Sequence, residues 1–179
     1  MKKFISLFMC IISTAYSVFY AGIGGFKGND GALSKIGLEH PVLFAIWGIL
    51  TCIALFFCIF IAYTDTKFKF HYPMLLIAFV GMILTICCDF DYDLKLQYWL
   101  HCIGSMTFSI VSGLTVFMLF LLKKDYIFTV ITGGILITDL VLLIIFKETA
   151  FIELMPIFAG FVMLCIHNLR REKETVEIK

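Results

Sequence analysis

Six apolar blocks dominate this sequence and restrict its fold more than any other feature. They run over residues 4–22, 41–63, 73–88, 98–122, 127–146 and 152–169. A helix needs about 20 apolar residues to cross about 30 Å of hydrocarbon, and most of the blocks reach that length. The chain is 61% hydrophobic and only 15% charged, whereas soluble domains carry about 25% charged residues. We therefore predict an all-α integral membrane protein, with a six-transmembrane-helix bundle forming a single domain over residues 1–169.

Basic residues divide unevenly between the two sides of this predicted bundle. If the N-terminus is cytoplasmic, ten basic residues lie on that side: Lys2, Lys3, Lys67, Lys69, Lys123, Lys124, Arg170, Arg171, Lys173 and Lys179. Four lie on the other side: Lys27, Lys35, Lys95 and Lys147. The positive-inside rule then places both the N and C termini in the cytoplasm, with residues 170–179 as a charged cytoplasmic tail.

The ends of the chain and its net charge bear on location and partners. The first apolar run is longer than the apolar core of a usual signal peptide, so we expect a retained first helix. We expect the protein to be integral to the bacterial cytoplasmic membrane, with membrane lipids around it. A net charge of +1 gives no indication of a nucleic-acid partner.

Residues 23–40 contain five glycines and predict an irregular loop rather than a helix.

Ionisable groups gather in the outer half of the predicted bundle. Asp139 is the strongest signal, because it lies about 10 Å inside its span and an ionisable group there is a functional candidate. We predict one outward-opening polar cavity that binds a lipid or small molecule. The candidate catalytic residues are His101, Asp139 and Asp89. The candidate ligand-binding residues are Glu153, Glu39, His40, Ser105, Trp99 and Trp47.

Two features of this region allow more than one interpretation: His101 and the acidic pair Asp91 and Asp93. His101 is either a hydrogen-bonded core histidine or a metal ligand or general base beside Ser105. Asp91 and Asp93 fit a solvated loop or a helix cap, and their spacing fails the calcium-loop pattern, which requires glycine and glutamate where Leu94 and Leu100 stand.

Two groups of small residues complete the pattern. Ser105, Ser109, Ser112 and Gly113 form a small-residue face that predicts close helix packing. The seven cysteines lack the paired spacing of a zinc site, and we interpret them as buried thiols that behave as small hydrophobes.

An acidic end to the third span, a histidine early in the fourth and a long first outer loop resemble the FRAG/DRAM/Sfk group and related bacterial six-helix domains of unknown function. Asp89, His101 and Ser105 carry this resemblance. Members of the eukaryotic group are linked to GPI-anchor lipid remodelling and to lysosomal or plasma-membrane regulation. The ceramidase and adiponectin-receptor hydrolases place a histidine pair in the last span, where this chain has only His167, at the opposite end.

The sequence leaves three functions open. The first is a membrane protein that binds a lipid or small molecule without catalysis. The second is a membrane-embedded lipid hydrolase, with or without a metal, that uses His101, Asp89, Asp139 and Glu153. The third is the substrate-binding subunit of an uptake transporter, since such subunits have a similar length and about six spans.

Overall fold

The computed structural model describes residues 2–25, 28–64 and 66–177, and every long element among them is a helix. Positions 1, 26, 27, 65, 178 and 179, which include Lys27 and Lys179 of the basic-residue distribution, lie outside the described residues. The elements are α1 (Lys2–Ile23), the 3-10 turn η1 (Gly28–Gly31), α2 (Leu33–Glu39), α3 (Pro41–Tyr63), α4 (His71–Cys87), α5 (Lys95–Leu122), α6 (Tyr126–Phe146) and α7 (Ala150–Glu177). The described residues contain no strand, which confirms the all-α class.

Five helices have the length and apolar composition to cross a membrane: α1, α3, α5, α6 and the part of α7 up to Arg170. The sixth long helix, α4, has 17 residues and is shorter. Large apolar side chains such as Val130 and Ile144 are about three-quarters exposed, as expected on a surface that faces lipid. The protein is therefore a multi-pass helical membrane bundle.

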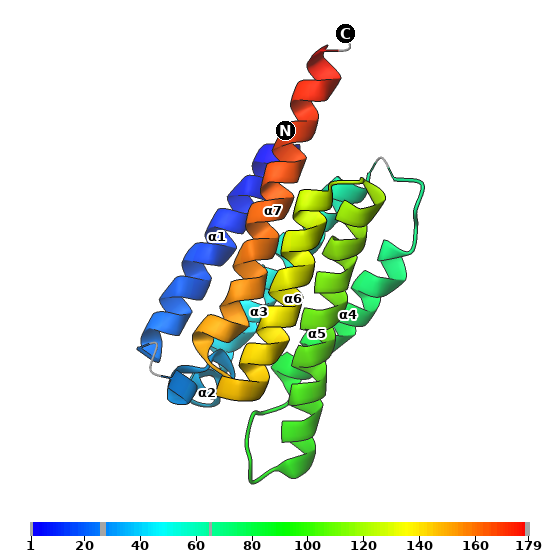
Figure 1. The fold of residues 1–179 in the computed structure, drawn as a ribbon. Coiled ribbons are helices and arrows are strands. Elements are labelled where there is room, and N and C mark those ends of the chain that lie inside the picture. The colour runs from blue at the N-terminus through cyan, green and yellow to red at the C-terminus, as the bar shows by residue number, and fades with distance from the viewer. Residues whose placement is uncertain (1, 26–27, 65, 178–179) are drawn as a thin grey trace.

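The six long helices run up and down along one axis, so that both ends of the chain lie toward the same end of the bundle (Figure 1). The short η1 and α2 lie at the opposite end. Helix α3 contacts α1, α2, α4, α5 and α7, whereas α6 packs on α5 and α7.

The expectation of an irregular loop over residues 23–40 is wrong for its second half, which forms α2. The buried residues Leu33 and Ile36 pack on α1 and α3 side chains, including Tyr20 and Phe44. The Tyr20 hydroxyl also donates to the Leu33 carbonyl, at 3.0 Å. These tertiary contacts stabilise a helix that the glycines of the segment disfavour.

Helices α4 and α5 approach each other closely at two glycines. A Cβ atom at Gly104 would lie 2.7 Å from the Gly81 carbonyl oxygen, and one at Gly81 would lie 2.8 Å from the Gly104 carbonyl oxygen. Both contacts are with backbone, which cannot move aside as a side chain can. Helix α5 thus packs on α4 at Gly104, which lies outside the predicted small-residue face. Of that face, Gly113 packs closely on the Leu136 side chain of α6, whereas Ser105, Ser109 and Ser112 line a cavity.

Candidate functional site

Glu153 in the first turn of α7 links this helix to α2. Its Oε2 accepts a hydrogen bond from the Leu33 backbone N–H, and its Oε1 accepts one from the Ser34 hydroxyl at 3.0 Å. Ala32 precedes α2 at the N-cap position and has no side chain that could accept a bond. The Glu153 carboxylate supplies the missing cap from a distant part of the chain, where the positive end of the helix favours it.

His101 is buried in the second turn of α5, and both of its ring nitrogens are engaged. Nδ1 lies 2.8 Å from the Cys88 carbonyl oxygen, and Nε2 lies 3.0 Å from the Ser34 Oγ. The ring stacks on Phe44, with centroids 5.8 Å apart, and packs against Phe90 of the acidic loop at 5.2 Å. This geometry favours the core-histidine reading, because neither nitrogen is free for a metal or a substrate.

Counting donors and acceptors restricts where the protons of this network lie. The Cys88 carbonyl only accepts, so Nδ1 of His101 carries a proton. Ser34 has one hydroxyl proton between two partners. If the hydroxyl donates to Glu153, all bonds are made only when Nε2 is protonated and donates to Oγ. If the hydroxyl donates to Nε2, all bonds are made only when the Glu153 carboxyl is protonated and donates to Oγ. If every bond of the network is made, the two arrangements hold equal numbers of protons and differ only in whether His101 or Glu153 carries one of them.

A cavity of about 160 Å³ adjoins this network and runs into the bundle between α3, α4, α5, α6 and α7. Its lining on α5 extends from Cys102 to Val116, which corresponds to about 21 Å of helical rise. Apolar side chains such as Leu55, Met82 and Phe108 make up most of the wall. The cavity is therefore long, narrow and mainly apolar.

The polar part of the wall is rich in hydrogen-bond acceptors. Three acidic residues line it, Asp139, Glu148 and Glu153, and no lysine, arginine or histidine among the described residues does. Four lining hydroxyls already donate to carbonyls of their own helices: those of Thr85, Ser105, Ser112 and Thr132. The Oδ1 atom of Asp139 is buried and has no hydrogen-bond partner in the described part of the chain. A ligand that brings donors or a positive charge would match this wall.

The structure brings together only part of the set of candidate residues. Asp139, Glu153, Ser105 and Trp47 line the cavity, and His101 reaches it through Ser34. Trp47 also donates from Nε1 to the Ser17 hydroxyl, at 3.0 Å.

The other candidates lie away from the cavity. Asp89, Glu39 and Trp99 are exposed and His40 is half-buried, and none of these four is in the lining. Asp91 accepts a bond from the Asp93 backbone N–H at 2.9 Å, which favours the loop reading of these two acids.

Sequence reasoning missed Ser34 and Glu148. Ser34 lies in the glycine-rich segment that was predicted to be a loop. The one indication of its role is its place between the apolar residues Leu33 and Ile36.

Fold and cavity define a class: multi-pass α-helical membrane proteins with a mainly apolar cavity between the helices that has acidic residues in its wall. No family model matches the chain, and neither curated proteins nor solved structures gave a match. The resemblance to the FRAG/DRAM/Sfk group accordingly stays a prediction based on topology and three residues.

Proposed function

We propose that the chain crosses the membrane six times, with α4 as the third of the six spans and both termini cytoplasmic. Seventeen residues of helix rise about 25 Å, which is at the lower end of spanning lengths. The start of α1 and the end of α7 lie at the same end of the bundle (Figure 1). An even number of spans requires this arrangement, because the chain then returns to the side on which it began. In this orientation Ser34, Glu148 and Glu153 belong to the outer half, and the protein resides in the bacterial cytoplasmic membrane.

We propose further that the protein binds an amphipathic molecule in this cavity, with an apolar chain and a polar end that carries an ammonium or a similar donor. A membrane lipid or a lipophilic amine has this chemistry. The observation that carries the proposal is Asp139, whose Oδ1 is buried and has no hydrogen-bond partner among the described residues. It lies beside a long, mainly apolar cavity whose described lining includes three acidic residues but no lysine, arginine or histidine. A carboxylate in such a place is costly unless a ligand or a proton compensates it.

The hydrolase alternative gains no support from the geometry. It requires His101 as a base or metal ligand, and both ring nitrogens of His101 are bonded within the protein. It also requires Asp89, which is exposed and outside the cavity lining. Binding without catalysis accounts for the cavity and requires fewer changes in the positions of these side chains.

The test compares ligands of equal chain length and different charge. The protein, with Trp99 replaced by Phe, retains Trp47 in the cavity wall as its one tryptophan. In a mild detergent, decylammonium should shift Trp47 fluorescence and raise the unfolding temperature, whereas decyl sulfate should do neither. Asp139→Asn should abolish the decylammonium effect, and the exposed Asp93→Asn should leave it unchanged. Equal responses to both ligands, or an undiminished response in Asp139→Asn, would refute the proposal.

A further inference from the structure

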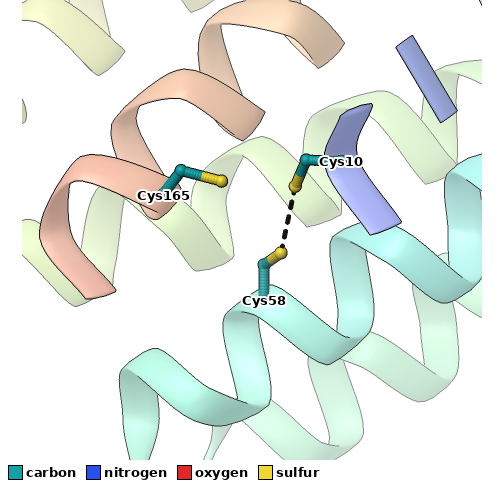
Figure 2. Close-up of side chains that lie close together, drawn as sticks. All are labelled: Cys10, Cys58 and Cys165. Carbon is teal, nitrogen blue, oxygen red and sulfur yellow. Dashed lines mark hydrogen bonds between the residues drawn. The ribbon is translucent and has the colours of Figure 1, made fainter. Parts of the chain in front are cut away.

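Three cysteines from three different helices meet at one point in the protein interior. Cys10 on α1, Cys58 on α3 and Cys165 on α7 are buried, with exposed fractions of 4%, 0% and 8%. Their Sγ atoms all lie within 4.8 Å of one another, and those of Cys10 and Cys58 are 3.2 Å apart (Figure 2). The prediction of buried thiols holds for these three, which in addition lie together, whereas it is wrong for Cys87, which is exposed.

This arrangement is the one place in the described part of the chain where three or more metal-ligating side chains come together. Figure 2 shows the three thiols pointing toward a common centre. Three sulfurs bound at about 2.3 Å to an ion in a trigonal arrangement lie about 4 Å from each other. The observed limits of 3.2 and 4.8 Å bracket that spacing, so small side-chain rotations would suffice to coordinate an ion.

The donor set selects the kind of metal. Thiolates are soft ligands that favour Cu(I) and Zn(II), whereas Mg²⁺ and Ca²⁺ prefer oxygen. Zn(II) in buried sites takes four ligands in a tetrahedron. A further donor close by is the Ser6 hydroxyl, 3.4 Å from the Cys58 sulfur, and a neutral hydroxyl is a weak ligand for zinc. Cu(I) is stable with three sulfurs and needs no fourth ligand.

We propose that Cys10, Cys58 and Cys165 form a binding site for one Cu(I) ion. The ion keeps its oxidation state on binding, and each thiol that becomes a thiolate releases one proton to solvent. An apolar groove between α1 and α7 contains both Cys10 and Cys165 in its lining and leads to the sulfurs. The site is separate from the acidic cavity, whose lining contains none of the three cysteines. This proposal therefore does not depend on the proposed function.

The experiment titrates the full chain in detergent, under anaerobic conditions, with Cu(I) buffered by the competing chelator bicinchoninate. We expect one equivalent to be taken from the chelator, with thiolate-to-copper absorption in the ultraviolet and an X-ray absorption spectrum fitted by sulfur ligands alone. Replacing Cys58 by Ala should weaken binding by more than about 100-fold, since even outer-shell changes at metal sites cost 10- to 100-fold. Bound Cu(I) should also raise the unfolding temperature, because it joins three helices.

A matched control retains the three cysteines and removes the rest. The variant with Cys52, Cys87, Cys88 and Cys102 all replaced by Ala should bind Cu(I) as tightly as the wild type. The proposal is overturned if this variant loses binding while remaining folded, or if Cys58→Ala binds normally. If Cys58→Ala does not fold, the sulfur-only X-ray spectrum of the wild-type protein decides. Binding of one Zn(II) in preference to Cu(I) would overturn the assignment of the metal.

Discussion

The Oγ atom of Ser34 lies 3.0 Å from Nε2 of His101, although 67 positions separate the two residues in the chain. The same hydroxyl bonds Glu153, so that α2, α5 and α7 meet at one serine. Neither His101 nor Glu153 would be fully bonded in the interior without it.

Ser34→Ala should destabilise the protein by about 1–3 kcal/mol, because it leaves buried atoms of His101 and Glu153 without partners. Ser105→Ala is the matched control, since the Ser105 hydroxyl bonds only the Cys102 carbonyl of its own helix. Its effect should stay within about 0.5 kcal/mol. Thermal unfolding in detergent measures both changes. Equal stability of the two variants would contradict the role of the Ser34 hydroxyl in bonding His101 and Glu153.

Glu153→Gln should preserve most of the stability, whereas Glu153→Ala should lose about 1–3 kcal/mol. A glutamine oxygen can accept from Leu33, and its amide can donate to the Ser34 hydroxyl, as a protonated carboxyl would. Alanine removes both contacts and leaves α2 uncapped. Chemical denaturation of the two variants under identical conditions provides the measurement. A glutamine variant as unstable as the alanine variant would show that the charge of Glu153, rather than its hydrogen bonds, is what stabilises α2.

Gly104→Ala should separate α4 from α5 and destabilise the protein by about 1–3 kcal/mol, because the new methyl group would lie 2.7 Å from a carbonyl oxygen. Gly134→Ala is the control, since a Cβ there meets nothing within 4 Å. It should be neutral or stabilising by up to about 1 kcal/mol, as alanine favours helix. Gly113→Ala should fall between the two, because its neighbour is the Leu136 side chain. Unfolding temperatures in one detergent would rank the three variants, and a Gly104 variant as stable as the Gly134 variant would be inconsistent with the α4–α5 contact.

The six-span topology predicts that positions 35 and 124 lie on opposite sides of the membrane. Single cysteines replacing Lys35 and Lys124, in a background without other cysteines, should react with a membrane-impermeant maleimide from opposite faces of sealed vesicles. Asp91→Cys should label together with the Lys35 variant, because both belong to the outer side. Labelling of the Lys35 and Lys124 variants from the same face would rule out the topology.

The helices could be predicted because their signal is local. The predicted block 41–63 coincides with α3, and Pro41 is the first residue of that helix. The block 127–146 differs from α6 by one residue, whereas α5 begins a turn earlier than the block 98–122. A continuous apolar run with a proline or polar residues at its ends needs no tertiary information to be recognised.

The candidate site could be predicted only in part, because its connections are long-range. Asp139 and Glu153 were visible as acids inside apolar segments, but nothing near Ser34 reveals partners 67 and 119 positions away. The same holds for Cys10 and Cys58, which are 48 positions apart. Trp99 was assigned from its depth, and depth does not tell which face of a helix a side chain occupies. Asp89 lies in the loop after α4, where its side chain is exposed.

The cap of α2 also imposes an order on biogenesis. The Leu33 N–H finds its acceptor in Glu153, 120 residues later in the chain. Synthesis proceeds from the N-terminus, so the segment of α2 leaves the ribosome long before α7 exists. Until the last helix inserts, the first turn of α2 has no carboxylate to stabilise it. The end of the bundle that contains α2 is therefore completed last, and a chain that stops before α7 leaves that end unfinished.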